Sequence, residues 1–218
     1  MRLLDNITLI CVTSTNIEQS IRALKVSMAH IKFGSVKLIS HEKPPNLPED
    51  IVYESCHELL TFESNSYYML YKLWNHVSTE FCITVQHDGY VVNPDCWTNE
   101  FLLYDYIGAP WAVGNPDFID PFGSIVRVGN GGFSLRSRKL LYVPQSIYIP
   151  PLLNNGMMYE DVHIAVRYKH LYEKMGCKFA PIGLAAKWSH ETHLPEYAHI
   201  IPFGFHRYLP SRISSGSI

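Results

Sequence analysis

Two spacings of hydrophobic residues alternate along the first half of the chain, one typical of buried strands and one typical of amphipathic helices. Residues 6–13 form a short, almost continuous apolar run rich in β-branched side chains, which predicts a strand buried on both faces. Apolar residues then recur at helical spacing, which predicts a helix over residues 17–31 that Asn16 caps and Gly34 ends. Residues 36–40 are the next predicted strand. This order of strand, helix and strand predicts a parallel α/β sheet.

The middle of the chain continues this alternation. Residues 67–77 place aromatic and apolar side chains on one helical face, which predicts a second helix. Residues 81–86 form another buried strand, and His87, Asp88 and Gly89 follow it. Because ligands of open α/β sheets bind beyond the carboxyl ends of the strands, we expect these three residues to lie at a ligand site.

The second half of the chain is less regular. Its predicted strands are short and lie at residues 107–111, 125–128, 133–135 and 178–180. The clearest late helix spans residues 160–175, and Gly176 closes it. Residues 188–218 have little periodicity, and we expect them to wrap the surface.

Composition narrows the class of protein. Hydrophobic residues make up 47% of the 218 residues, so the chain can bury a core and is not disordered. The 18 basic and 20 acidic residues nearly cancel, so no nucleic-acid partner is expected. No apolar run approaches the roughly 18 residues of a transmembrane segment. The sequence has no repeat and no linker, which predicts one domain over residues 1–210 and a flexible tail over residues 211–218.

Cysteine usage and the N-terminus predict the compartment. The five cysteines are dispersed and form no C-x-x-C pair, which favours a reducing environment. Residues 1–12 lack the small-residue cleavage site of a signal peptide. We therefore expect a cytoplasmic protein, with peripheral attachment to a membrane left open.

Three segments could carry chemistry. In the first, Asp88 follows a buried strand and precedes Gly89, so it could hold a divalent cation beside a diphosphate, because hard oxygen ligands suit Mg²⁺ or Mn²⁺. An ordinary Asp-Gly turn explains the same residues. The second segment, residues 129–132, has three glycines, which fit either a ligand close to the main chain or a tight hairpin. It is not a P-loop, since no Gly-Lys-Ser/Thr follows.

The third segment is the pair Glu160 and Asp161 at the start of the late helix. Carboxylates at that position can cap the helix, or one of them can act as a general base on a hydroxyl. The 11 histidines form no H-E-x-x-H motif, so a zinc hydrolase has little support. His190, Glu191 and His206 nevertheless cluster late in the chain, where a histidine can reach a metal or a diphosphate.

Together these segments resemble those of glycosyltransferases of the GT-A fold, in particular a small family still described as a domain of unknown function. The resembling segments occur in the family's order and are Q-H-D-G at 86–89, I-G-A-P-W at 107–111, V-G-N-G-G-F-S-L-R at 128–136, E-D at 160–161, W-S-H-E at 188–191 and P-F-G-F-H at 202–206. The resemblance covers roughly residues 8–206. It implies a GT-A-like, mostly parallel sheet flanked by helices.

The same resemblance implies a function. A sugar would move from a nucleoside-diphosphate sugar, UDP- or GDP-linked, to an acceptor hydroxyl on a glycan, with inversion. The implied donor-binding residues are Val12, Thr13, Ser14, His87, Asp88 and Gly89. The implied sugar- or acceptor-binding residues are Trp111, Gly131, Gly132, Phe133, Trp188 and Glu191. Among the aromatic residues Tyr90, Trp97, Trp111 and Trp188, we expect one to stack on a sugar.

Catalytic and metal-binding roles also follow from the resemblance. Asp161 would be the general base, and Glu160 would orient the acceptor or the donor sugar. Mn²⁺ or Mg²⁺ would bind Asp88 and His206, with His190 as the second choice of histidine. The family's D-x-D position keeps Asp88 but lacks a second acidic residue, so a nucleotide-sugar or carbohydrate binding module without catalysis is an alternative. A nucleotidyltransferase is less favoured, because residues 13–20 contain neither Gly nor Lys.

Overall fold

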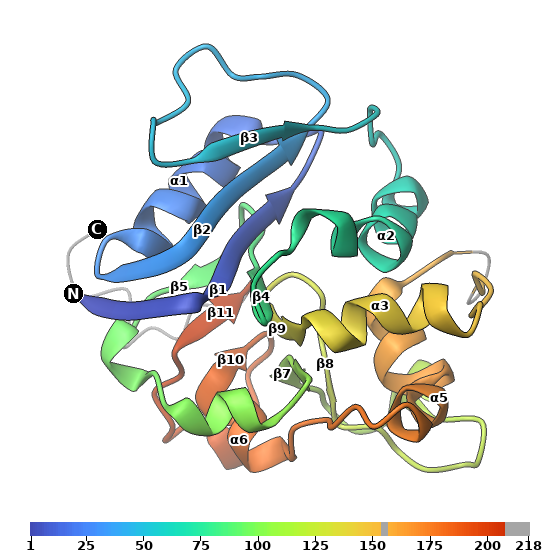
Figure 1. Ribbon diagram of the computed structural model, residues 1–218. Helices are drawn as coiled ribbons and strands as arrows, with labels where there is room; N and C mark the ends of the chain where they lie inside the picture. The colour runs from blue at the N-terminus through green and yellow to red at the C-terminus, as the bar shows by residue number, and fades with distance from the viewer. Residues whose placement is uncertain (154–156, 208–218) are drawn as a thin grey trace.

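A six-stranded sheet forms the centre of the computed structural model, which describes residues 1–153 and 157–207. The strand order is β3-β2-β1-β4-β9-β6 (Figure 1). The strands are β1 (Arg2–Val12), β2 (Ile31–Ser40), β3 (Val52–Ser55), β4 (Phe81–Thr84), β6 (Tyr106–Ile107) and β9 (Ser134–Ser137). Strands β1, β2, β3 and β4 are parallel to one another, and β9 is antiparallel to β4 and to β6. The prediction of a mostly parallel sheet is confirmed, and the predicted tail lies outside the described residues.

Two smaller sheets and a set of helices complete the fold. One small sheet has the order β10 (Ser189–His190), β11 (Gly204–His206) and β5 (Gly89–Val91), and the other pairs β7 (Ala109–Pro110) with β8 (Val128–Gly129). The α-helices are α1 (Ile17–Met28), α2 (Phe62–Tyr71), α3 (Arg138–Ser146), α4 (Glu160–Val162), α5 (Lys169–Lys174) and α6 (Ile182–Trp188). The short 3-10 and π segments are η1 (Leu73–His76), η2 (Pro94–Cys96), η3 (Asn99–Leu103), η4 (Pro116–Phe118), η5 (His163–Arg167) and η6 (Pro195–Tyr197).

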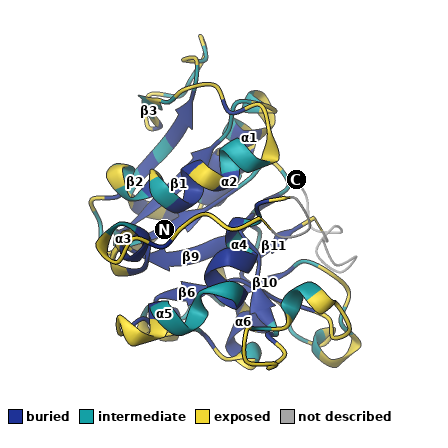
Figure 2. Ribbon diagram, turned by 90° about the vertical axis from the view of Figure 1, so that its right-hand side faces the viewer, coloured by how far each residue is buried: buried dark blue, intermediate teal, exposed yellow. Residues whose placement is uncertain are grey.

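Helices cover both faces of the central sheet, as its apolar strands require. Successive side chains of a strand point to opposite faces, so β1 contributes to two cores. Leu9 belongs to a core with Leu24 of α1, whereas Ile10 belongs to a second core with Met69 of α2 and Leu141 of α3. The strands are accordingly mostly buried, while exposed residues lie on outer helical faces and loops (Figure 2).

The connection between α1 and β2 differs from the prediction. The helix ends at Met28, and β2 runs from Ile31 through Gly34, so Gly34 lies inside a strand and does not end the helix. A Cβ atom at Gly34 would lie 2.0 Å from the carbonyl oxygen of Asp5, next to the register shift between β1 and β2. Close backbone approach explains this glycine. Asn16 precedes α1 in a left-handed conformation, with φ of 52°, and its side chain makes no capping bond.

The second helix begins earlier than the pattern of apolar residues predicts. Thr61 and Ser64 form a reciprocal capping box, so α2 starts at Phe62 and not at residue 67. The helix also ends at Tyr71, and the 3-10 turn η1 replaces its predicted last turns. A serine in place of the usual Glu or Gln at the third helical position hides this start in the sequence.

In the second half of the chain, the structure excludes one open alternative and contradicts two predictions. The strands that flank the glycine segment do not form a hairpin, because β8 pairs with β7 and β9 pairs with β4 and β6. The helix predicted over residues 160–175 is divided into α4, η5 and α5. Residues 188–206 do not merely wrap the surface, because they form β10 and β11 and bury Trp188 and Phe203 completely.

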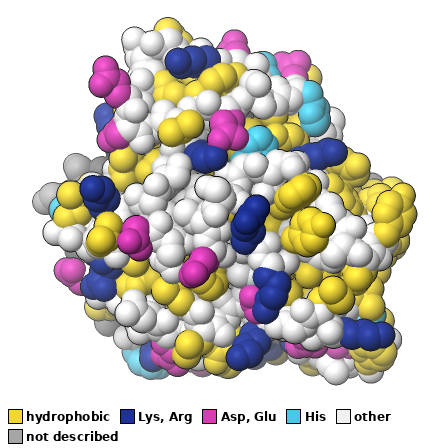
Figure 3. All heavy atoms as spheres, viewed as in Figure 1, with side chains coloured by type: hydrophobic (Ala, Val, Ile, Leu, Met, Phe, Trp, Pro, Cys, Tyr) yellow, Lys and Arg dark blue, Asp and Glu magenta, His cyan; other side chains and the backbone are white. Residues whose placement is uncertain are grey.

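The described part of the chain contains no helix that combines the length and the apolar character needed to cross a bilayer. All five cysteines are free thiols. On the face in Figure 3, Lys and Arg side chains are interspersed with Asp and Glu side chains. No basic stripe runs over the described residues on this face, in keeping with the nearly balanced charge.

Candidate functional site

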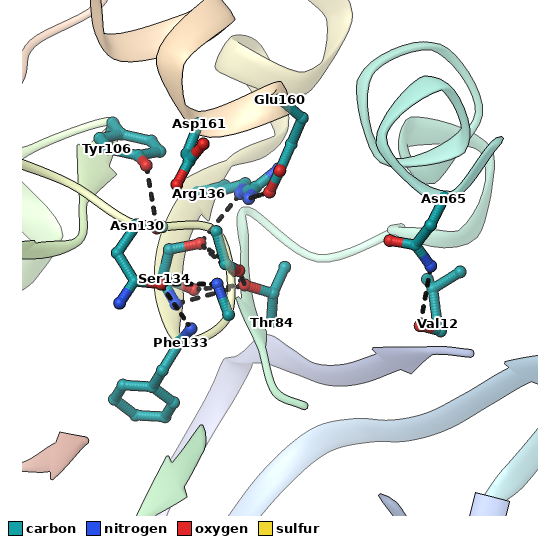
Figure 4. Close-up of polar contacts among 12 residues, drawn as sticks. Val12, Asn65, Thr84, Tyr106, Asn130, Phe133, Ser134, Arg136, Glu160 and Asp161 are labelled. Atoms are coloured by element: carbon teal, nitrogen blue, oxygen red, sulfur yellow. Dashed lines mark hydrogen bonds and ion pairs between the residues drawn. The ribbon is translucent and has the colours of Figure 1, made fainter. Parts of the chain in front are cut away.

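A cavity of about 300 Å³ opens where the carboxyl ends of β1 and β4 meet, at the edge of the sheet that the sequence predicts. We call it the sheet-edge cavity. Its polar lining residues include Thr13, Ser14, Thr61, Asn65, Gln86, His87, Asp88 and Arg207. The amide nitrogen of Asn65 in α2 donates to the carbonyl oxygen of Val12 at 3.4 Å (Figure 4), which fixes one wall of the cavity. Five of the six predicted donor-binding residues line it; Gly89 is buried beside it in β5.

Asp88 lines this cavity and contacts the buried His206 behind it, because β11 pairs with β5. The antiparallel register sets His206 opposite Gly89, the residue after Asp88. The Asp88 Oδ1 and His206 Nε2 atoms are 3.5 Å apart, and the backbone N–H of Arg207 donates to the carbonyl oxygen of Asp88 at 2.8 Å. Two residues 118 positions apart in sequence thus share one wall of the site.

A chain of polar contacts continues from His206. Its Nδ1 atom lies 3.2 Å from Glu191 Oε1, and Glu191 Oε2 accepts from the indole N–H of Trp111 at 3.0 Å. Burial opposes the charged form of His206, but the hydrogen bonds to Asp88 and Glu191 outweigh it and raise the pKa of His206 to about 9. The hydrogen bond from His206 lowers the pKa of Asp88. The wall therefore holds a histidinium between two carboxylates.

The residues of this wall fit a divalent cation in part. Asp88 Oδ1 and His206 Nε2 are both buried and lie 3.5 Å apart, so they could bind one ion together once His206 Nε2 gives up its proton. No group of three or more His, Cys, Asp or Glu residues that could hold a metal occurs in residues 1–153 and 157–207. Two protein ligands would therefore need oxygen atoms from a diphosphate or from water to complete the coordination of Mn²⁺ or Mg²⁺.

A second cavity, of about 420 Å³, adjoins the first. We call it the aromatic cavity. Its lining residues include Trp111, Phe118, Tyr159, Asp161, Glu191 and Arg207. The rings of Trp111 and Phe118 stack with centroids 3.9 Å apart and an interplanar angle of 6°. Because Arg207 lines both cavities and Glu191 bonds to His206, the two cavities share a wall.

The adjacent carboxylates of α4 have opposite surroundings. Glu160 is buried, and its Oε1 atom accepts from Arg136 Nη2 of β9 at 2.8 Å (Figure 4). Asp161 faces the aromatic cavity, and its Oδ1 atom accepts from the N–H of Val162 at 2.8 Å. Burial, with the negative charges of Glu160 and Glu191, raises the pKa of Asp161 to about 7. Asp161 can therefore exchange a proton near neutral pH, whereas Glu160 is held in an ion pair.

The glycine segment lies directly behind these side chains. A Cβ atom at Gly129 would lie 1.8 Å from the Trp111 ring, one at Gly131 would lie 1.7 Å from Glu160 Oε1, and one at Gly132 would lie 2.2 Å from His206 Nε2. Asn130 holds the turn, with φ of 85°, and its side-chain oxygen accepts from the N–H of Gly132 at 2.7 Å. Close packing against three site residues, and not a hairpin, explains the glycines.

Burial corrects several predicted sugar contacts. Phe133 and Trp188 are fully buried and stack on each other with centroids 5.0 Å apart, so a sugar cannot reach them. Gly131 and Gly132 are buried behind Glu160 and His206. Among the four candidate stacking residues, Trp97 and Trp188 lie in the core with Phe101 and Phe203, and Tyr90 packs against Phe205. Of these four residues, Trp111 alone lines one of the two cavities, the aromatic cavity.

The structure also distinguishes the two candidate histidines. His206 faces Asp88, whereas His190 is buried in β10 and its Nε2 atom has no hydrogen-bond partner. Burial lowers the pKa of His190. Glu160 was predicted to orient a substrate. It instead pairs with Arg136, and neither residue lines either cavity.

Sequence reasoning assigned no role to three residues of the site. Asn65 and Arg207 line the sheet-edge cavity, and Arg136 pairs with Glu160 behind the glycine segment. An arginine directly after a predicted buried strand is a signal, because a buried charge requires a partner, and Arg136 is fully buried. The sequence holds no comparable signal for Asn65 or Arg207, whose positions depend on α2 and β11.

Comparisons with solved structures find similar chains at low identity. A mannosyltransferase from Pyrobaculum calidifontis, in complex with GDP-Man and Mn²⁺, is 11% identical, with a TM-score of 0.44, over 80% of this chain and 53% of that chain. The apo form of the glycosyltransferase GlyE from Streptococcus pneumoniae TIGR4 is also 11% identical, with a TM-score of 0.46, over 93% of this chain and 54% of that chain. A197 from STIV is 14% identical, with a TM-score of 0.38, over 82% and 80%. This chain spans about half the length of the first two structures.

No curated protein matches the sequence. A family model with the description "Protein of unknown function (DUF5672)" matches residues 40–206. This match covers β3, β4, both small sheets and the segment from Asp88 to His206, which is well over half of the chain. The chain therefore belongs to the DUF5672 family.

Proposed function

We propose that this protein transfers a sugar from a nucleoside-diphosphate sugar to an acceptor hydroxyl. The observation that carries the proposal is the meeting of Asp88 and His206 at the shared wall of two cavities, with Asp161 lining the second. The sheet-edge cavity would bind the nucleotide, and the shared wall at Asp88 and His206 would face its diphosphate. The aromatic cavity would bind the acceptor beside the Asp161 carboxylate. The glycosyltransferases among the similar solved structures are compatible with this function.

The sheet-edge cavity would take the nucleoside. Hydroxyl groups of Thr13 and Ser14 and the amide of Asn65 offer donors and acceptors to a base and a ribose. Its far wall, at Asp88 and His206, would face the diphosphate. A divalent ion, when bound by Asp88 and His206, would stabilise the negative charge of the departing diphosphate. The protein's own contribution there is to hold these groups in place before the reaction.

The aromatic cavity would take the acceptor, with Asp161 as general base. The acceptor oxygen would form a bond to the anomeric carbon while the bond from that carbon to the diphosphate oxygen breaks. The hydroxyl proton would move to the Asp161 carboxylate, and the electron pair of the broken bond would leave with the nucleoside diphosphate. Attack from the side opposite the leaving group inverts the anomeric configuration. The half-buried ring of Phe118, which stacks on the buried Trp111, would support a sugar ring.

An assay with UDP- and GDP-sugars, Mn²⁺ and a panel of glycan acceptors tests the proposal. We expect Asp161→Asn to lower the transfer rate by about 10²–10⁴-fold, because a general base contributes about that much. Binding of the nucleoside diphosphate should persist in this variant. The matched control is Asp50→Asn, at an exposed aspartate outside both cavities, and it should keep the rate of the unaltered protein.

Two outcomes would contradict parts of this proposal. A product that retains the anomeric configuration would remove the role of Asp161 as the base for direct attack. Calorimetric binding of nucleotide sugars without turnover of any acceptor would favour the binding module. That second candidate is supported by the incomplete D-x-D position, at which Asp88 is followed by Gly89 and Tyr90.

A further inference from the structure

Arg207 occupies a distinctive place between the two cavities. It lines both of them, and among their described lining residues it is the only Lys or Arg. Its guanidinium Nε atom lies 4.0 Å from Asp88 Oδ2, and 67% of its side chain is exposed. The backbone N–H bond to Asp88 fixes where the side chain starts, while the guanidinium can still reach a ligand at the shared wall.

Arg207 is the exposed cation at this wall, and its 4.0 Å contact with Asp88 is long enough for the guanidinium to turn toward a ligand. The His206 ring is buried, and the carboxylates of Asp88 and Glu191 flank it at 3.5 and 3.2 Å. Arg136 is buried against Glu160 and does not line either cavity. A diphosphate carries several negative charges, so an anion entering here needs positive charge that the wall's carboxylates do not already balance. The exposed guanidinium supplies it.

The backbone of Arg207 adds an independent observation. Its φ is 60°, in the left-handed region that disfavours residues with a Cβ atom. Glycine would occupy this position without strain. An arginine kept in a conformation that suits glycine indicates that the side chain itself is used.

We propose that Arg207 binds the diphosphate of the nucleotide substrate and supplies positive charge at a site whose metal-binding motif lacks its second carboxylate. This inference rests on the proposed function and adds to it a phosphate-binding residue outside the motifs of the sequence. The fork of the guanidinium suits two phosphate oxygens, so Arg207 contributes both charge and orientation. The contribution is largest when no divalent ion shares the charge of the diphosphate.

The test measures binding of UDP and GDP, and of the nucleosides uridine and guanosine, by calorimetry in the presence of a chelator. The variant is Arg207→Gly, which relieves the backbone and removes the guanidinium. We expect nucleoside diphosphate to bind about tenfold more weakly, nucleoside binding to stay unchanged, and the melting temperature to stay equal or rise. The affinity of Arg207→Lys for nucleoside diphosphate should lie between those of the unaltered protein and Arg207→Gly, because lysine keeps the positive charge but lacks the two-pronged guanidinium.

Further measurements separate this proposal from the one on which it rests. The matched control Arg22→Gly removes an exposed arginine of α1 outside both cavities and should not change diphosphate affinity. Raising the salt concentration should weaken diphosphate binding more in the unaltered protein than in Arg207→Gly. If the unaltered protein binds no nucleoside diphosphate either with the chelator or with Mn²⁺, the proposed function itself fails. If it binds and Arg207→Gly binds equally well, only the role of Arg207 is overturned.

Discussion

The two cavities differ in how the chain builds them. The sheet-edge cavity is lined by residues that follow predicted strands, such as Thr13 after β1 and Asp88 after β4. The aromatic cavity is lined by loop residues from three distant segments, near Trp111, Asp161 and Glu191. Parallel strands bring their carboxyl ends together whatever the loops do. The first cavity therefore follows from the sheet, whereas the second depends on specific contacts between loops.

The two neighbouring carboxylates of α4 also differ in their surroundings. Glu160 points to Arg136 of β9 (Figure 4) and joins α4 to the central sheet, while Asp161 lines the aromatic cavity. Glu160 thus fixes α4 to the sheet, and the Asp161 carboxylate is left facing the aromatic cavity. The following predictions test whether the two cavities are separable in this way.

The largest effect is expected from breaking the anchor of the aromatic cavity. Glu160→Gln leaves the fully buried Arg136 charge without its partner, which typically costs about 3–5 kcal/mol. For a chain of this length, the melting temperature should fall by about 6–20 °C. The matched control is Glu196→Gln at the exposed Arg127–Glu196 pair, whose 2.9 Å separation is nearly the same. Equal shifts for both variants, measured by calorimetry, would contradict the anchoring role of Glu160.

Adjacent glycines offer a test of each cavity separately. The Cβ atom added by Gly131→Ala would clash with Glu160, and the one added by Gly132→Ala would clash with His206. Each should cost about 1–3 kcal/mol through overpacking. Gly132→Ala should weaken binding of UDP or GDP, whereas Gly131→Ala should lower transfer to the acceptor and leave that binding intact.

The control for both is Gly183→Ala, at a helical glycine whose added Cβ would touch nothing within 4 Å. It should raise the free energy of unfolding by about 0.5–1 kcal/mol. Loss of diphosphate binding in Gly131→Ala, with Gly132→Ala unaffected, would reverse the assignment of the two cavities.

The smallest effect concerns pH. The pKa of Asp161 is raised to about 7, and a general base works only when deprotonated. The transfer rate, as kcat/KM, should therefore rise about tenfold per pH unit below pH 6 and level off above about pH 8. In Asp161→Asn, the residual rate should lose this acidic limb. An unchanged profile in that variant would assign the limb to another group.

Much of the sheet-edge cavity was predictable from sequence for a physical reason. The apolar runs at residues 6–13 and 81–86 are continuous and rich in β-branched residues, so they specify buried parallel strands, and the polar residues after them must meet at one edge. Helix bounds were less predictable. The start of α2 depends on a Thr61–Ser64 capping box, and the division of residues 160–175 depends on the packing of η5.

The sequence by itself determined that Asp88 ends a central strand and that Glu160 and Asp161 begin a helix. Only the tertiary structure decided that His206 pairs with Asp88, that Glu160 turns inward to Arg136 and that Trp188 is core. Local patterns record the periodicity of a strand or a helix, which depends on neighbours a few residues apart. Contacts such as β5 with β11 join residues more than a hundred positions apart, and they form only when the whole chain is packed.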